Sequence, residues 1–304
     1  MSDETGSDKK LPTIPQDKLP KVSIITPTYN RERQMRAAVI NYKLFDYPRD
    51  KLEWIIVDDG DYDIARMFSK TDDSIKYYHI SPYCKAQLHK MLKSNLKKQS
   101  ANLSNKKKKR FKLRNIHSGH FYKLRLPIGM KRNICIQYAS GDVIFHMDDD
   151  DLYYPKAILH AVTQLMAGWN DGIRCVGSLT TGVFHTSRFL SMMYSRSDKQ
   201  MRSQQVMEHT LCYDRSFWEE RKFDNQDVKG EGSFSLKNRL DKVKIVSTKD
   251  FSVVLQHNNN ENPIKQFTTD LKDTEPSGWH FKQIPDEQFM LITTFDEEEP
   301  TKLS

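Results

Sequence analysis

Four consecutive aspartates, Asp148 to Asp151, come directly after the apolar stretch Val143 to Met147. That stretch has the length and composition of a buried strand, and open α/β sheets bind ligands at the carboxyl ends of such strands. Four adjacent carboxylates would repel one another strongly unless a cation offset their charge. Asp148 and Asp150 are two residues apart, so a turn can bring both onto one hard cation. The alternative is that these acids only favour the N-terminus of a helix predicted over Lys156 to Met166; for four in a row we favour a metal site.

Two further predicted strands also end in polar residues. Val22 to Thr26 is followed by Pro27, Thr28, Tyr29 and Asn30, and Trp54 to Val57 is followed by Asp58, Asp59 and Gly60. Because parallel strands present their carboxyl ends at one edge of a sheet, the three polar clusters should converge. A tyrosine ring can stack on a base, a carboxylate can accept from a base imide or a ribose hydroxyl, and an aspartate pair can hold a metal against a diphosphate. Together they predict a nucleotide site. The chain has neither a G-x-G-x-x-G motif nor a P-loop motif, so neither a dinucleotide-binding fold nor a P-loop is indicated.

Strand and helix signals alternate along the chain, as in a doubly wound sheet. Besides the segments above, we predict a helix over about 31–44, a short strand over 75–80 and a helix over about 130–139. The fold class is therefore α/β: a single domain with a mostly parallel nucleotide-binding sheet flanked by helices, a basic insertion and a smaller mixed second half. We expect a flexible segment over 1–20, a main domain over 21–263 and a tail of unknown role over 264–304, with bounds that rest on the extent of the family resemblance given below.

Positive charge is confined to one segment. Between Ser74 and Gly141 there are 17 Lys and Arg residues and no acid, so a chain of net charge +8 leaves the remainder at −9 (8 minus 17). The insertion over about 82–127 lies inside this segment and includes the run Lys106 to Arg110, and Gln87 to Lys93 has roughly helical apolar spacing. It could be a solvated excursion without a partner, a surface for an anionic acceptor or membrane headgroups, or a nonspecific phosphate-binding patch. Its aromatic residues match no RNA-binding signature, so no specific nucleic acid is expected.

Signals for export or membrane insertion are lacking. No apolar run approaches the roughly 18 residues of a membrane-spanning helix, and residues 1–21 lack the apolar centre of a signal peptide. The cysteines form no Cys-x-x-Cys pair and predict free thiols in a reducing compartment: Cys84, Cys135, Cys175 and Cys212. We therefore expect a cytoplasmic enzyme.

The order of these motifs resembles that of the family 2 glycosyltransferases, which have the GT-A fold. Val22 to Arg31 and Ile55 to Gly60 resemble the start of that family, and Arg132 to Asp142 is similar to its R-N-x-G-x-x-x-A-x-G-[DE] segment, with Cys135 in place of the glycine. Asp148 to Asp151 falls where the family has D-x-D-D. The resemblance extends from about Lys21 to Leu159, apart from the insertion, and is thinner to about Pro263.

This resemblance implies a metal-dependent, inverting transfer of a sugar from a nucleotide-diphosphate donor, with a UDP-sugar expected. The acceptor would be a hydroxyl of a glycan, a lipid or a protein. Asp150 is implied as a direct ligand of Mn²⁺ or Mg²⁺, and Asp148 as a ligand of the metal or the ribose. The residues implied to bind the nucleotide-sugar are Pro27, Thr28, Tyr29, Asn30, Arg31, Asp58, Asp59, Arg132, Asp148 and Asp149.

The catalytic base is where the chain departs from the family pattern. Gly230, Glu231 and Gly232 fall at the family's G-E-D, so Gly232 replaces the aspartate usually assigned as base. In an inverting displacement a carboxylate must remove the proton of the acceptor hydroxyl. Glu231 is the first candidate for a catalytic role and Asp227 the second, while Glu231 could instead cap a helix starting near Ser233.

Two histidines near predicted strands have different expected roles. GT-A enzymes often bring a histidine near the end of the domain back to the metal, so the resemblance makes His257 a candidate metal ligand; the alternative is an ordinary loop residue after the apolar run Phe251 to Leu255. His146 is expected to be a packed strand residue. A further alternative covers the whole chain: a non-catalytic GT-A domain that serves as a nucleotide- or glycan-binding module. The intact acidic cluster favours an enzyme, and Gly232 favours the binding module.

Overall fold

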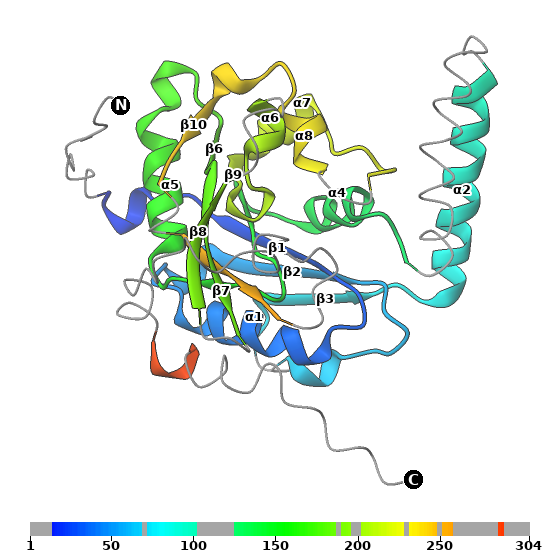
Figure 1. Cartoon of the computed structure of the whole chain (residues 1–304), viewed down its shortest axis with the longest axis horizontal. Coiled ribbons are helices and arrows are strands. Elements are labelled where there is room, and N and C mark those ends of the chain that lie inside the picture. The colour runs from blue at the N-terminus through cyan, green and yellow to red at the C-terminus, as the bar shows by residue number, and fades with distance from the viewer. Residues whose placement is uncertain are drawn as a thin grey trace, which may run out of the picture.

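The computed structural model describes residues 14–68, 72–101, 125–186, 190–195, 202–227, 231–247, 251–257 and 285–288. They contain a seven-stranded sheet in the order β10-β6-β9-β4-β1-β2-β3, shown in Figure 1. Its strands are β1 (Val22–Thr28), β2 (Leu52–Asp58), β3 (Ile75–His79), β4 (Val143–His146), β6 (Cys175–Gly177), β9 (Cys212–Asp214) and β10 (Val243–Ile245). β4, β1, β2 and β3 are parallel, and β9 is antiparallel to both of its neighbours. The α/β class and the mostly parallel sheet predicted from the sequence are confirmed.

Helices cover both faces of this sheet because its central strands are apolar on both sides. Ile24 and Trp54 pack with α1 (Glu32–Leu44) and α5 (Ala157–Ala167). Their chain neighbours Ile25 and Ile55 point to the other face. There they pack with α4 (Ile128–Tyr138), α7 (Arg215–Glu220) and α8 (Glu231–Leu236). All four strand side chains are fully buried.

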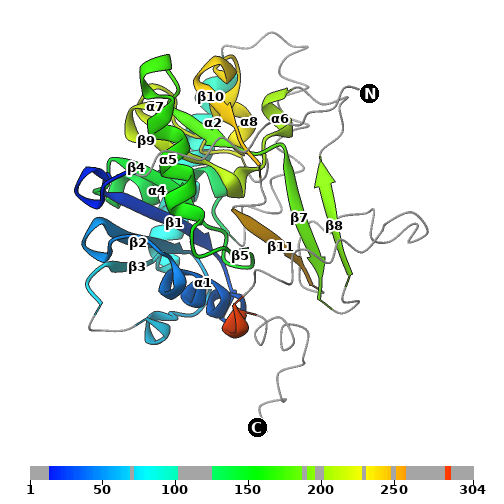
Figure 2. The ribbon, with the colours of Figure 1, turned by 90° about the vertical axis from the view of Figure 1, so that its left-hand side faces the viewer.

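A second sheet lies beside the first (Figure 2). Its strand order is β5-β11-β7-β8, with the bounds β5 (Leu152–Tyr153), β7 (Thr180–His185), β8 (Leu190–Ser195) and β11 (Ser252–Gln256). β5 follows the four aspartates directly, and it pairs with β11 through Tyr153 and Ser252. The second sheet therefore closes over the end of β4.

Short helical turns connect the larger elements. They are η1 (Gln16–Lys18), η2 (Arg49–Lys51), η3 (Ala65–Met67), η5 (Trp169–Asp171), α6 (Arg202–Gln205), η6 (Glu208–Thr210) and η7 (Leu240–Lys242). No helix in the described part of the chain combines the length and the apolar character that crossing a membrane would require.

Two strands run further than the sequence predicted. β1 reaches Thr28 and β2 reaches Asp58, so Pro27, Thr28 and Asp58 end strands instead of following them. Proline lacks the N–H that a ladder needs, yet it fits here because β4 pairs with β1 only as far as Ile25. The polar residues are therefore held in strand geometry at the edge of the sheet.

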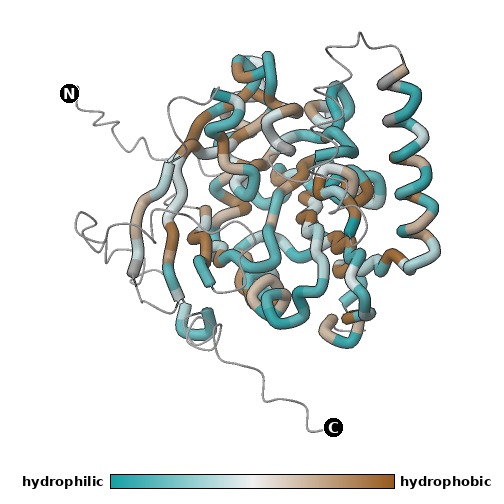
Figure 3. Tube along the Cα trace, turned by 45° about the vertical axis from the view of Figure 1, so that its right-hand side comes forward, coloured by the Kyte–Doolittle hydropathy of each residue, from teal (hydrophilic) through white to brown (hydrophobic). Residues whose placement is uncertain are grey.

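The start of the basic insertion is helical, as its apolar spacing predicted. α2 (Pro82–Ala101) stands at one side of the molecule in Figure 1 and is mostly hydrophilic in Figure 3. Leu88 and Leu92 attach it to Leu126 and Met130. Lysines 90, 93, 97 and 98 of this helix are exposed. The run Lys106 to Arg110 lies outside the described residues.

A buried carboxylate joins the strands at the opposite edge from the aspartates. Glu53 accepts from Ser23 Oγ at 2.5 Å, from Ser140 N at 2.5 Å and from Lys76 Nζ at 2.7 Å. Gly141 is required beside this network, since a Cβ there would lie 2.6 Å from Ser23 Oγ. Burial alone would raise the pKa of Glu53, but the bonds from Lys76, Ser23 and Ser140 outweigh it and lower the pKa from 4.5 to about 2.

Glu53→Gln keeps the size of this side chain and removes its charge. We expect the free energy of unfolding at neutral pH to fall by about 3 kcal/mol, because each unit of pKa shift corresponds to roughly 1.4 kcal/mol. The folded-state pKa is below the unfolded value, so the contribution is complete above pH 4.5 and is lost as the pH falls toward 2. Urea unfolding of wild type and variant across this range measures it, with the exposed Glu219→Gln as control. A wild-type-to-variant difference that stays constant down to the lowest pH would contradict it.

Candidate functional site

The ends of β1, β2 and β4 meet through direct hydrogen bonds between their polar residues. Thr28 Oγ1 donates to Asp149 Oδ2 at 2.5 Å. Lys131, a buried residue of α4, donates from Nζ to the main-chain O of Thr28 and to Asp59 Oδ1, both at 2.9 Å. The three polar clusters therefore converge at one edge of the sheet, as the strand pattern predicted.

The segment Asp148 to Asp151, which we call the acidic turn, buries three of its four aspartates. Asp149, Asp150 and Asp151 are between 3% and 8% exposed, while the Asp148 side chain is about one-third exposed. Arg31 Nη1 lies 2.8 Å from Asp149 Oδ1 and 2.6 Å from Asp150 Oδ2. One guanidinium, with a single positive charge, thus faces two buried carboxylates. When both carboxylates are ionised, their two negative charges exceed the positive charge beside them.

The pKa values of the acidic turn show how this charge is shared. Burial raises the pKa of Asp149 more than Arg31 lowers it. Burial also acts to raise the pKa of Asp150, but Arg31 and His257 outweigh it and lower the value to about 2. The pKa of Asp151 is well above its ordinary value, because it is buried and because Asp150 and Asp148 are close. A bound cation would favour the ionised form of each of these carboxylates.

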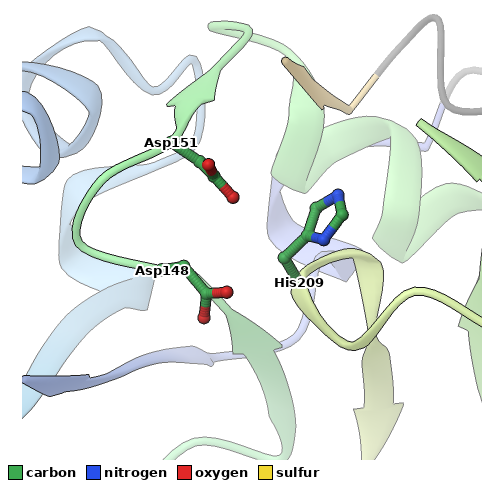
Figure 4. Close-up of side chains that lie close together, drawn as sticks. All are labelled: Asp148, Asp151 and His209. Carbon is green, nitrogen blue, oxygen red and sulfur yellow. The ribbon is translucent and has the colours of Figure 1, made fainter. Parts of the chain in front are cut away.

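Three side chains at this turn form a set that fits a divalent cation. Asp148, Asp151 and His209 each offer one ligand atom, and these atoms lie within 4.8 Å of one another. In Figure 4 the two carboxylates come from the ends of the acidic turn and His209 faces them from η6. Carboxylate oxygens with an imidazole nitrogen suit Mn²⁺, and carboxylates alone suit Mg²⁺. The residues present therefore fit the cation that the sequence implied.

The predicted ligands Asp150 and His257 lie beside this set and contact each other. His257 Nε2 is 3.5 Å from Asp150 Oδ2, and the side chain of His257 is fully buried. Asp150 also holds Arg31. Asp148, the third predicted ligand, belongs to the set with Asp151 and His209. Asp148 and Asp150 belong to the acidic turn by sequence, and the structure brings His257 into contact with it. Asp151 and His209 were not named as ligands in the sequence analysis.

Arg132 of α4 supplies a second cation at the turn. Its Nη2 lies 3.0 Å from Asp148 Oδ1, and the residue is 1% exposed. Its partner Asp148 is the most exposed of the four aspartates. A guanidinium held there can also meet phosphate oxygens, for which its planar fork is suited.

The residues predicted for the nucleoside lie at the ends of β1 and β2. Asp58 accepts from Gly60 N at 2.7 Å and from Tyr77 Oη at 2.8 Å, and burial raises its pKa. Tyr29 is half-buried, with Lys85 Nζ 5.2 Å and Arg125 Cζ 5.7 Å from the centre of its ring. Its ring therefore already has cations over it, which a stacked base would have to share or displace.

The neighbouring predicted residues have structural partners. Asn30, at φ 52°, exchanges two 2.7 Å hydrogen bonds with Asp61. Gly60 must be a glycine here, because a Cβ would lie 2.8 Å from Asp58 Oδ1 and 2.9 Å from Asn30 Oδ1. Asp59 is fully buried, and Lys131 and the main-chain N of Leu126 donate to it. Pro27 is buried within β1. Asn30 is the exposed member of this group.

The acceptor-side candidates lie near the start of α8. The helix begins at Glu231, earlier than the predicted start near Ser233, and the Glu231 side chain lies outside the described part of the structure. Asp227 is 9% exposed and its main-chain O accepts from Gly129 N at 3.1 Å. Packing favours glycine at position 232, because a Cβ there would lie 2.8 Å from Cγ of Glu208. The side chain of Glu208 thus lies in the space that a Cβ at position 232 would need.

Several residues of the site could not be found from the sequence. The sequence assigned no metal-binding or supporting role to His209, Asn41 or Lys131. His146, expected to be a packed strand residue, is fully buried in β4 and binds the main-chain O of Glu208 at 2.9 Å and Tyr213 Oη at 2.9 Å. The hydrogen bond between His146 and Glu208 holds η6, and with it His209, against the end of β4.

Comparison with known proteins gives matches among solved structures alone. No family model and no curated protein matches the chain. The mannosyltransferase PcManGT from Pyrobaculum calidifontis, in complex with GDP-Man and Mn²⁺, is 16% identical over 78% of this chain and 57% of its own, with a TM-score of 0.49. S. aureus TarS is 15% identical over 77% of this chain and 36% of its own, with a TM-score of 0.47. TarS 1-349 in complex with UDP-GlcNAc is 14% identical over 92% of this chain and 68% of its own, with a TM-score of 0.45. The chain thus spans little more than half of the first of these proteins and about a third of the second, and its function has to be judged from its own residues.

Arg31→Met removes the guanidinium that serves Asp149 and Asp150. We expect the free energy of unfolding without metal to fall by about 3 kcal/mol, because removing one partner leaves buried carboxylates uncompensated. Mn²⁺ should then raise the Tm of the variant more than that of wild type, since a cation replaces the lost charge. Differential scanning calorimetry with and without Mn²⁺ measures both effects, and Arg36→Met, on the exposed face of the same helix, is the matched control. Equal Mn²⁺-induced shifts in wild type and Arg31→Met would count against a cation at this turn.

Proposed function

We propose that this chain is a nucleotide-sugar-dependent glycosyltransferase that uses a divalent cation, Mn²⁺ or Mg²⁺. The observation that carries the proposal is the acidic turn, where carboxylates at the ends of parallel strands lie beside Arg132 of α4 and His209 of η6. The sequence segments that resemble family 2 glycosyltransferases also occur in the same order as in that family. We take residues 21–263 as the unit that contains this site.

The donor would lie along the edge of the sheet, with its parts matched to different residues. Tyr29 and Asp58 would receive the nucleoside, with uridine proposed from the family resemblance. Arg132 would hold oxygens of the diphosphate, and Asp148, Asp151 and His209 would hold the cation, with Asp150 and His257 beside them. When bound, the cation would offset the charge that develops on the leaving nucleoside diphosphate.

The transfer would proceed with inversion in a single displacement. The oxygen of the acceptor hydroxyl forms a bond to the anomeric carbon, and the bond from that carbon to the diphosphate oxygen breaks with its electron pair. The hydroxyl proton passes to a carboxylate on the acceptor side. Glu231 and Asp227 are the candidates from the sequence, and Glu208 joins them because its side chain fills the space beside Gly232.

The acceptor would carry its hydroxyl on a glycan, a lipid or a protein. α2 presents exposed lysines 90, 93, 97 and 98, and Lys85 of the same helix lies over Tyr29 at the donor edge. An anionic acceptor would therefore find positive charge on the helix that borders the donor edge at Tyr29. A KM for the acceptor that rises with salt concentration would support binding of an anionic acceptor by these lysines. A KM that does not change with salt would refute it.

Calorimetric titration of nucleoside diphosphates and diphospho-sugars tests the donor site. We expect wild type to bind one nucleoside diphosphate in the presence of Mn²⁺ and to bind it at least tenfold more weakly without the ion, since loss of one charge-assisted contact has about that effect. Asp150→Ala should abolish the metal-dependent part, because it removes a carboxylate beside the cation, while Asp142→Ala, at an exposed position before β4, should not. Absence of any nucleotide binding to wild type would remove the transferase proposal.

Turnover of single carboxylate variants separates an enzyme from a binding module. We expect one of Glu231→Gln, Asp227→Asn and Glu208→Gln to lower kcat by about 100-fold or more with donor affinity unchanged, as loss of a general base does. Product release is measured as free nucleoside diphosphate in the presence of acceptor. Unchanged kcat in all three variants would exclude these residues as the base. Nucleotide binding without turnover in wild type would instead favour the non-catalytic module, which Gly232 makes the second candidate.

A further inference from the structure

The described residues near the end of the chain bring one side chain back to the acidic turn. Gln288 is 1% exposed, and its Nε2 donates to Asn41 Oδ1 at 2.7 Å and to the main-chain O of Tyr153 at 2.9 Å. Figure 2 shows residues 285–288, in red, next to α1, which carries Asn41. These residues lie outside the span 21–263 that the family motifs cover.

Both acceptors of Gln288 belong to the hydrogen-bond network that holds the acidic turn. Asn41 Nδ2 donates to the main-chain O of Asp151 at 2.8 Å, and Asn41 Oδ1 also accepts from Tyr153 N at 3.1 Å. Tyr153 Oη accepts from the main-chain N of Asp148 at 3.0 Å and donates to the main-chain O of His209 at 3.2 Å. Asn41 and Tyr153 thus contact both ends of the turn and the segment that carries His209.

The chemistry at position 288 calls for a neutral double donor. A primary amide presents two N–H groups in one plane, and the two atoms in front of it are both acceptors. Without Gln288, the main-chain O of Tyr153 and Asn41 Oδ1 would each lose a donor in a site closed to water, which is costly for buried polar groups. A methionine of similar length donates nothing there, and an ionised glutamate would place a third acceptor against the other two.

We propose that Gln288 is a positioning residue for the acidic turn. It locks Asn41 and Tyr153 in the orientation in which Asp148, Asp151 and His209 present their ligand atoms to one point. The positioning itself follows from these hydrogen bonds, and its consequence for cation binding rests on the proposed function. The segment 264–304, to which the sequence assigned no role, therefore supplies a side chain that supports the site.

The test compares full-length wild type with Gln288→Met and Gln288→Glu, and uses the exposed neighbour Glu287→Gln as matched control. Hydrogen exchange is followed in the peptide over residues 148–154, which contains the amide that Tyr153 donates to Asn41. We expect exchange there to become about tenfold faster in Gln288→Met, the scale set by one buried hydrogen bond, and faster still in Gln288→Glu. Peptides from β1 and β2 should be unchanged, as should every peptide of Glu287→Gln.

Mn²⁺ titration by calorimetry, well below the Tm of every variant, is the second measurement. We expect affinity to fall roughly tenfold in Gln288→Met, as is usual when a residue that orients metal ligands is lost. Asn41→Ala combined with Gln288→Met should weaken binding by less than the product of the two single effects, because the residues act through one network.

The outcomes separate this proposal from the proposed function. A lowered Tm with unchanged exchange over 148–154 would mean that Gln288 only stabilises the fold, and it would overturn the positioning role. Exchange accelerated equally in all peptides would overturn it too. If wild type binds no Mn²⁺, the metal-dependent function fails, while the exchange measurement still decides whether Gln288 positions the turn.

Discussion

Mutual repulsion among buried carboxylates is the constraint around which this structure is arranged. Asp149, Asp150 and Asp151 lie out of solvent next to one another, with Arg31 against Asp149 and Asp150 and Arg132 against Asp148. Charges this close in a poorly hydrated site interact far more strongly than they would in water. Folding must therefore surround the turn with hydrogen-bond donors.

Three separate parts of the fold supply these donors. β1 brings Thr28 to Asp149, and α1 brings Asn41 to the main chain of Asp151. The second sheet adds the main-chain N of Leu255, which donates to Asp151 Oδ1 at 3.3 Å. Because each part comes from a different region of the sequence, the turn acquires its geometry only when both sheets have formed. The stability of the two sheets and the geometry of the acidic turn are therefore coupled.

The start of α8 packs closely against η6 at Gly232. The family resemblance in the sequence places an aspartate at that position, where this chain has glycine. The side chain of Glu208 occupies the same space, however, and its main-chain O is fixed by His146 directly before the acidic turn. A carboxylate is thus present in this region on η6, a different element from the one that carries Gly232.

The fold class and the location of the site could be predicted from the sequence because both depend on local patterns. Apolar β-branched runs identify buried strands, and polar residues directly after them must lie at one edge of a parallel sheet. The convergence of Thr28, Asp59 and Asp149 follows from that rule. Strand ends were less certain: β1 includes Pro27 because β4 leaves it unpaired there, which no local pattern reports.

The identity of the residues that complete the site was decided by tertiary structure alone. His209 faces the aspartates because His146 and Tyr153 hold η6 against the end of β4. Gln288 reaches the same turn across 247 residues of sequence from Asn41. Such contacts depend on how separate elements pack, and packing distance is unrelated to sequence distance. The sequence by itself therefore determined the sheet, the acidic turn and the edge where they meet, whereas the side chains that surround and orient the turn emerged only when the chain was folded.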